Sequence, residues 1–216
     1  SSGGRRAACG VKDASSGGSG GSADGEVIKI GYVSPQTGPA ASFGETDSFL
    51  VETFKNALKD GIQSGGKTYR VEFVVKDSAA DPQRAASVAS ELINGDKVDL
   101  MLASSTPESV NPVSDACEAN GIPCISTVVP WQAWYFGRGA KETDKAAYKF
   151  TYHFSFGVEN FAHAYEANWK QLDTNKKVGV LWPNDSDGNA IRAALGVPES
   201  FPDEVLAAAA AAVAAP

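Results

Sequence analysis

The chain has 216 residues, of which 43% are hydrophobic and 21% charged, a composition typical of one or two packed domains. Its 19 basic and 26 acidic residues give a formal net charge of −7. That sign is wrong for following a nucleic-acid backbone or an anionic membrane surface, so we expect no nucleic-acid partner. No apolar run reaches the roughly 18 residues that a membrane-spanning helix needs.

Residues 1–26 predict an anchor and a linker rather than a folded element. Cys9 stands in the run Ala7-Ala8-Cys9-Gly10, and a Gly/Ser-rich stretch follows at 15–25. This A-A-C-G run resembles the processing site of a bacterial lipoprotein, in which the cysteine is acylated, and the stretch after it is a flexible tether. The alternative is a chance match, because Arg5-Arg6 stands where an apolar signal segment should end.

Strand and helix patterns alternate along the next hundred residues. Apolar runs predict strands at 27–33, 69–76, 100–103 and 122–127, and helical spacing predicts helices at 45–60, from Pro82 and from Pro107. Asp81 and Thr106 are the expected N-caps of the last two helices. This order predicts a doubly wound parallel sheet of Rossmann-like type, in which ligands bind beyond the carboxyl ends of the strands.

A second α/β unit is expected after a polar connector. We predict an aromatic strand at 148–156, a helix at 159–172, a strand at 178–182 and a helix beyond Asp187. The chain is thereby divided into a linker (1–26), a first lobe (27–147) and a hinge strand with an incomplete second lobe (148–216).

Residues 61–68, GIQSGGKT, match the phosphate-loop pattern G-x-x-x-x-G-K-[ST]. That pattern binds phosphate only where a strand enters the loop and a helix leaves it. Here a predicted helix enters and a predicted strand leaves, so we interpret the match as a helix end and a turn.

The expected ligand-binding edge follows the strands at 100–103 and 122–127. Ser104, Ser105 and Thr106 place three hydroxyls between a strand and a helix N-terminus, where they and the helix dipole favour a carboxylate or another polar group. Capping explains only Thr106. Phe43, Trp131 and Trp134 lie in predicted loops and are expected to add an apolar wall, with core packing as the alternative.

Cys117 and Cys124 leave two interpretations open. They flank the turn between a helix and a strand, close enough in sequence for a disulfide in an oxidising compartment. They are equally compatible with two small buried apolar side chains.

The sequence shows no constellation of catalytic or metal-binding residues, so we expect no enzyme activity, metal or cofactor. The two histidines, His153 and His163, have no Cys or His neighbours at metal-ligand spacing. Asp77 and Asp81 are better explained as a strand end and a helix cap than as an acid/base pair.

The ordered series of segments resembles the periplasmic solute-binding proteins of ABC importers, of the leucine/isoleucine/valine-binding type. The matching runs are IKIGYVSPQTGPAASFGETDSF, FVVKDSAADPQRAASVASELI, residues 99–134 and KKVGVLWPNDSDGNA, which together span 28–190. The resemblance implies the type 1 periplasmic binding fold, in which two lobes close on a ligand by hinge motion. The family's second lobe continues past Pro216, so the resemblance implies a chain truncated within that lobe.

The resemblance also implies roles for individual residues. Phe43 falls where the family places a ligand-packing aromatic, and residues 104–106 fall in the turn that takes a ligand carboxylate. Val128 and Pro130 stand where the family supplies a backbone carbonyl and then a threonine hydroxyl to the ligand's ammonium group, so the hydroxyl is gone, which disfavours an α-amino acid. The predicted ligand contacts are Phe43, Ser104, Ser105, Thr106, Ser126, Val128, Trp131, Trp134, Tyr152, Trp182 and Asp185.

The function implied is capture of a small polar or amphipathic solute, such as a branched-chain amino acid, an amide or an aromatic acid, for delivery to a membrane permease. We expect a monomer in the periplasm or lipid-anchored at the outer face of the cytoplasmic membrane. The alternatives are a ligand-sensing regulatory domain and an α/β enzyme that uses the same crevice.

Overall fold

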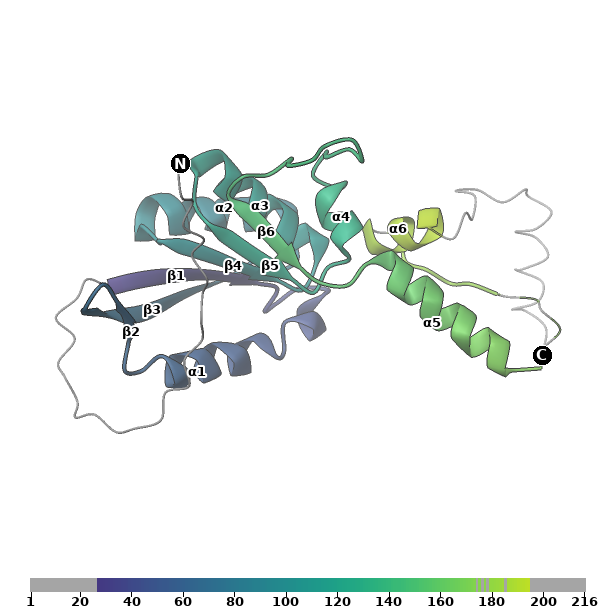
Figure 1. The fold of residues 1–216 in the computed structure, drawn as a ribbon, viewed down its shortest axis with the longest axis horizontal. Coiled ribbons are helices and arrows are strands. Elements are labelled where there is room, and N and C mark those ends of the chain that lie inside the picture. The colour runs from purple at the N-terminus through teal and green to yellow at the C-terminus, as the bar shows by residue number, and fades with distance from the viewer. Residues whose placement is uncertain (1–26, 174, 176, 178, 185, 195–216) are drawn as a thin grey trace, which may run out of the picture.

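The computed structural model describes residues 27–173, 175, 177, 179–184 and 186–194. Six strands form one sheet in the order β2-β3-β1-β4-β5-β6, and every neighbouring pair is parallel except β2 and β3 (Figure 1). The strands are β1 (Val27–Ser34), β2 (Ile62–Ser64), β3 (Lys67–Asp77), β4 (Leu100–Ser104), β5 (Cys124–Thr127) and β6 (Thr151–Phe154). The predicted doubly wound parallel sheet is therefore confirmed.

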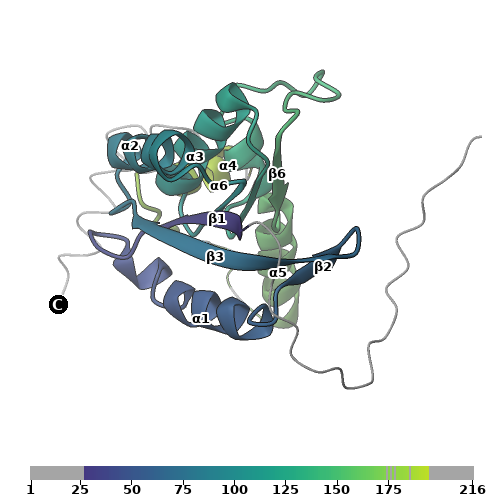
Figure 2. The ribbon, with the colours of Figure 1, turned by 90° about the vertical axis from the view of Figure 1, so that its left-hand side faces the viewer.

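The helices lie on both faces of the sheet and beyond its end. They are α1 (Asp47–Ala57), α2 (Pro82–Glu91), α3 (Pro107–Asn120), α4 (Trp131–Tyr135), α5 (Val158–Gln171) and α6 (Ser186–Ala194), with a 3₁₀ turn η1 (Ala41–Phe43) and a π turn η2 (Leu92–Asp96). Figure 2 shows α1 on one face and α2, α3 and α4 on the other. β6 leads out of the sheet into α5, and α6 lies beside α4 (Figure 1).

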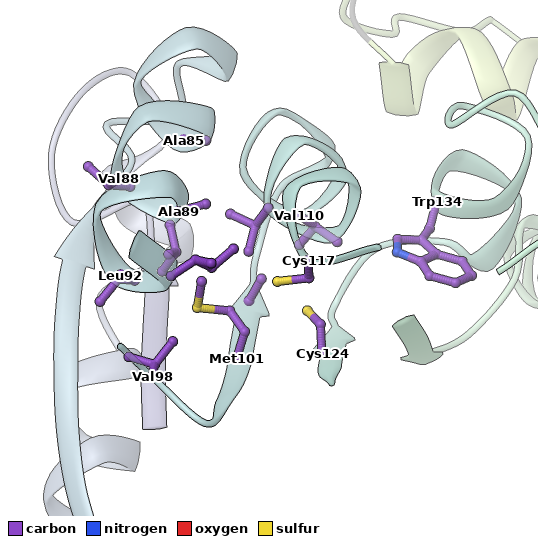
Figure 3. Close-up of a cluster of buried hydrophobic side chains, with 14 of the residues drawn as sticks. Ala85, Val88, Ala89, Leu92, Val98, Met101, Val110, Cys117, Cys124 and Trp134 are labelled. Atoms are coloured by element: carbon purple, nitrogen blue, oxygen red, sulfur yellow. The ribbon is translucent and has the colours of Figure 1, made fainter. Parts of the chain in front are cut away.

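The main core fills the space between the sheet and the helices α2 and α3 (Figure 3). Leu92, Met101, Val110 and other apolar side chains pack there with almost no exposed surface. A Cβ at Gly31, in the middle of β1, would lie 2.6 Å from the Met101 sulfur, so a larger residue there would have to displace this buried side chain. The helix caps at Asp81 and Thr106 form as predicted, and each accepts a hydrogen bond from the backbone N–H of the third helical residue.

Cys117 and Cys124 belong to this core as free, buried thiols. Their sulfur atoms face one another between α3 and β5 (Figure 3). A hydrogen bond to Cys124, together with burial, raises the pKa of the Cys117 thiol. The structure therefore shows two small buried side chains, and the disulfide is not present in it.

The opposite face of the sheet is only half covered. α1 lies over β1 and β3, where Phe54 stacks on Phe73 with ring centroids 6.2 Å apart. Ile125, Tyr152 and Phe154 of β5 and β6 remain 53%, 62% and 81% exposed. Parallel sheets are normally buried on both faces. Within the described residues no helix covers this half.

The GIQSGGKT match forms a turn rather than a phosphate loop, as the order of the flanking elements predicted, and this turn closes a β-hairpin that was not predicted. β2 pairs antiparallel with β3, and Gly65 and Gly66 make the turn with φ angles of +58° and +80°. Positive φ at both central positions is the geometry of the type I′ hairpin turn, which favours glycine. No helix follows this loop, so its amides do not converge with a helix N-terminus on a phosphate.

Three predicted details of the elements are wrong. Described residues 179–184 form no strand, because no described strand lies beside them to pair with. Trp131 and Trp134 lie in the short helix α4 rather than in a loop. Helical spacing places Phe49 with Leu50 and Phe54 on one apolar face of the helix predicted at 45–60, but Phe49 is 72% exposed, whereas Asp47 and Val51 are buried. Among the described residues no helix is long and apolar enough to cross a membrane.

Candidate functional site

The carboxyl ends of the central strands form the edge at which a ligand is expected. The register pairs Val33 with Ala103 and Ser104 with Thr127, so β1, β4 and β5 end side by side. The turn after β4 contains Ser105 with a φ of +90°, an unusual conformation for a residue other than glycine. The turn passes directly into the N-terminus of α3, where the helix dipole favours a negative charge.

The hydroxyl groups of this turn bind to the protein itself. Ser104 donates a 3.0 Å hydrogen bond to the buried carboxylate of Asp47 and pairs with the Tyr32 hydroxyl at 2.8 Å. Ser105 Oγ lies 3.0 Å from the Phe43 carbonyl oxygen and 3.3 Å from the Asp47 carboxylate. Burial raises the pKa of Tyr32, and its hydrogen bond to Ser104 only partly offsets this.

Thr106 is also satisfied internally. Its hydroxyl accepts a hydrogen bond from the Ser109 backbone N–H at 3.3 Å and donates one to Ser109 Oγ at 3.1 Å. Ser109 Oγ in turn lies 2.6 Å from Ser78 Oγ. The three hydroxyls predicted to bind a ligand thus have partners within the protein, and the turn that contains them leads into the N-terminus of α3.

Of the aromatic residues predicted to contact a ligand, Phe43 and Trp131 are exposed and follow the carboxyl ends of strands β1 and β5 in the chain. Phe43 ends η1 with 60% of its surface exposed, and its carbonyl contact with Ser105 fixes it beside the turn. Trp131 begins α4 and is 38% exposed, with its ring packed against Phe136 at 5.6 Å. Val128, also exposed, precedes α4 with a φ of +69°.

Three other predicted contacts lie elsewhere. Trp134 is buried in the core, where it stacks on His153 at 5.2 Å and donates to Ser114 Oγ. Ser126 is buried and contacts His153 Nδ1 at 2.8 Å. Tyr152 lies on the half-covered face, and its hydroxyl reaches back to the Lys149 carbonyl, away from the carboxyl edge. The helix α4 has only five residues, too few for the spacing of apolar residues to show that Trp134 faces the core.

The last two predicted contacts, Trp182 and Asp185, follow α5 in the chain. Trp182 is partly buried in the segment that forms no strand. Asp185 lies outside the described residues. Cys9 and the Gly/Ser stretch lie outside them as well.

His153 is a structural residue. Its Nε2 lies 2.6 Å from the Val129 carbonyl oxygen, so this nitrogen carries a proton and donates it, while Nδ1 faces the Ser126 hydroxyl. Burial lowers the pKa of His153, which favours the neutral ring. Among the described residues no group of His, Cys, Asp and Glu side chains is arranged to hold a metal ion.

Sequence reasoning missed one cluster beside the edge. The Glu159 carboxylate accepts hydrogen bonds from the Trp131 indole N–H at 3.0 Å and from the Gln132 side-chain amide at 2.5 Å. Those two bonds lower the pKa of Glu159, with the Trp131 bond the larger effect. An acidic residue in the first turn of a helix is common, so the sequence carried no signal for this contact.

Comparison with known proteins identifies the family. The family described as "Periplasmic binding protein" matches residues 27–197. The chain belongs to the periplasmic binding protein family. The fold is accordingly that of an incomplete type 1 periplasmic binding protein.

Individual relatives agree with this assignment. The Leu/Ile/Val-binding protein of Escherichia coli K12 is 31% identical over 102 residues, which are 47% of this chain and 27% of that protein. The fold resembles a solute-binding protein of an ABC transporter from Rhodopseudomonas palustris BisB5, solved with 3,4-dihydroxybenzoic acid. The TM-score is 0.59 at 22% identity, and the match covers 77% of this chain and 42% of that one.

A second solved structure has the same fold. It is an ABC transporter solute-binding protein from R. palustris in complex with 4-hydroxybenzoate, with a TM-score of 0.59, 20% identity and coverage of 79% and 42%. The chain thus spans about a quarter of the curated relative and two fifths of the solved ones. The two solved proteins are solute-binding proteins of ABC transporters, and the curated relative is a Leu/Ile/Val-binding protein.

Proposed function

We propose that this chain is part of the extracytoplasmic solute-binding component of an ABC importer. Support comes from the family match over 27–197 combined with the edge geometry. Phe43 and Trp131 are exposed beside the turn that ends in the N-terminus of α3, so an apolar wall adjoins a site that favours negative charge. The partner would be a membrane permease, and the binding protein acts as a monomer.

The proposed solute is a small carboxylate with an apolar or aromatic body. A carboxylate suits the positive end of α3. Val128 and Pro130, which follow β5, offer no hydroxyl to an ammonium group, so an aromatic acid fits better than an α-amino acid. The two R. palustris relatives were solved with ligands of this kind, which supports the proposal by analogy.

Two lobes are proposed to enclose the solute. The first comprises residues 27–147, and the second starts at the hinge strand within 148–216. Closure of two lobes normally buries most of a ligand, so residues 1–216 tested on their own are expected to bind weakly. Ligand-observed NMR detects such weak binding.

The test is therefore a saturation-transfer NMR screen of the chain with benzoate, 4-hydroxybenzoate, 3,4-dihydroxybenzoate and leucine. We expect transfer to the aromatic acids, and a loss of it in the variants Phe43→Ala and Trp131→Ala. Tyr152→Ala is the matched control, because Tyr152 is an exposed aromatic on the other face of the sheet. No transfer to any acid, or equal losses with the control, would contradict the proposal.

A lipid anchor at Cys9 is the second part of the proposal. The A-A-C-G run and the stretch at 15–25 support a tether that holds the protein at the outer face of the cytoplasmic membrane. When the chain is expressed behind a lipoprotein signal peptide, it should partition into the detergent phase, and Cys9→Ala should release it. If the Cys9→Ala variant partitions into the detergent phase as the parent does, Cys9 is not the site of acylation.

A further inference from the structure

The start of α5 is held against the start of α4 by a set of hydrogen bonds. The Trp131 backbone N–H donates to the Phe156 carbonyl at 2.9 Å, and the Val158 N–H donates to Gln132 Oε1 at 3.0 Å. Glu159 accepts from both Trp131 and Gln132, as described above. We call this set of bonds, made by Trp131, Gln132, Phe156, Val158 and Glu159, the α4–α5 clamp.

Gly157 gives the clamp the space that it needs. The Glu159 side chain folds back over the start of its own helix, and a Cβ at position 157 would overlap the Glu159 carboxylate, with 2.0 Å to the nearer oxygen. The N–H of Gly157 is itself bound to the Asn160 side chain at 2.8 Å, so this end of the helix is fixed from both sides. A larger residue at 157 would force the carboxylate away from Trp131.

The clamp lies where a solute and a moving lobe would meet. Trp131 presents an exposed ring at the carboxyl edge, and its indole N–H binds the carboxylate of α5. β6 passes through residues 155–157 into α5, so the clamp spans the connection between the sheet and the next unit (Figure 1). One side chain therefore contacts both the expected solute position and the helix beyond the connection.

We propose that the Trp131–Glu159 hydrogen bond couples solute binding at the sheet edge to the orientation of α5. Glu159 is a positioning residue, which acts on the solute through Trp131 rather than by touching it. The solute class is the one proposed above, a planar aromatic acid whose ring packs on the indole. This inference rests on the proposed function, because a solute shifts the position of a lobe only if its affinity differs between the two positions.

The first arm of the test needs no solute. Hydrogen–deuterium exchange of the peptide covering 156–162 is measured in the chain and in the variants Trp131→Phe, Glu159→Ala and Glu159→Gln. Trp131→Phe keeps an aromatic ring but removes the donor. We expect about tenfold faster exchange in Trp131→Phe and Glu159→Ala, the loss of about one hydrogen bond, and an intermediate rate in Glu159→Gln. Glu166→Ala, an exposed change on the same helix, is the control and should leave the rate unchanged.

The second arm is a double-mutant cycle on solute affinity, with 4-hydroxybenzoate titrated by NMR. We expect Trp131→Phe and Glu159→Ala each to weaken binding, and the double variant to bind about as well as either single one, a coupling of about fivefold. If the losses of affinity in the two single variants add up in the double variant, Trp131 and Glu159 act independently on solute binding. That result would overturn the coupling.

The two ways of failing are distinguishable. If the parent chain binds none of the acids, the proposed function fails and the coupling fails with it, whatever the exchange rates show. If the parent binds and the exchange at 156–162 is the same in Glu159→Ala as in Glu166→Ala, the clamp does not hold α5 and the coupling alone is overturned.

Discussion

The Ser104 hydroxyl donates a 3.0 Å hydrogen bond to the Asp47 carboxylate, which joins the end of β4 to the first turn of α1. Both side chains are buried, at 1% and 3% exposure. Tyr32 and Ser105 complete the network, so α1 and the turn beside the proposed solute site are held in one arrangement. This arrangement positions Phe43, whose carbonyl oxygen contacts the same turn.

Replacing Asp47 should therefore destabilise the fold. Asp47→Ala removes the carboxylate acceptor of the buried Ser104 hydroxyl and one of the two oxygen acceptors near Ser105 Oγ, the other being the Phe43 carbonyl. We expect a loss of about 1 to 3 kcal/mol in the free energy of unfolding. Urea denaturation followed by circular dichroism measures this loss. Asp60→Ala, at an exposed position just after α1, is the control and should change stability by less than about 0.5 kcal/mol. Equal effects at both positions would contradict the structural role of the network.

The Glu118 carboxylate should make stability depend on acidic pH. Burial opposes its ionisation, but hydrogen bonds from the backbone N–H groups of Lys149, Phe150 and Thr151 outweigh that effect and hold its pKa below the usual 4.5. A carboxyl whose folded pKa is lowered contributes stability above the unfolded pKa. This contribution is lost as the pH falls through the lower, folded pKa.

The corresponding experiment compares Glu118→Gln with the parent across pH. The variant should be less stable by about 1 to 3 kcal/mol at pH 7, because charge-assisted hydrogen bonds are lost. The difference should shrink as the pH falls below 4.5. Glu142→Gln, at an exposed position, should show no such trend. A pH-independent difference for Glu118→Gln would mean that the ionised form is not what stabilises the fold.

The thiols of Cys117 and Cys124 should be inaccessible in the folded chain. Both are buried and free, so in a Cys9→Ala background we expect no reaction with Ellman's reagent under native conditions. After denaturation without a reducing agent, two thiols per chain should react. If no thiol reacts even in denaturant, the purified protein contains the disulfide instead.

Truncation should affect stability far less at Phe154 than at Met101. Phe154 is 81% exposed on the half-covered face, so Phe154→Ser should change stability by less than about 0.5 kcal/mol. Met101 has no exposed surface, and Met101→Ala should cost about 2 to 5 kcal/mol. Chemical denaturation measures both effects. A large loss of stability in Phe154→Ser would show that the ring packs against the protein.

Local sequence signals were sufficient to predict most strands of the sheet and the N-caps of α2 and α3. Asp81 before Pro82 and Thr106 before Pro107 each predict a helix start, because the side chain accepts a backbone hydrogen bond and the proline has no N–H to satisfy. The turn at 61–68 was predicted, but the short strand β2 that pairs with β3 was not, because three residues carry no recognisable strand pattern. Trp134 was misplaced because five residues of α4 contain too little periodicity to show which side faces the core.

The sequence by itself determined the alternation of strands and helices, the parallel sheet, and the position of Ser104 to Thr106 at the carboxyl end of β4. Those properties depend on how apolar residues and helix-capping residues are spaced along the chain, and this spacing can be read from the sequence. Only the tertiary structure decided that the hydroxyls of Ser104 and Ser105 bind Asp47, and that Trp131 binds Glu159. These partners are 57, 58 and 28 residues apart, so no local pattern encodes which of the many polar side chains meet when the sheet forms.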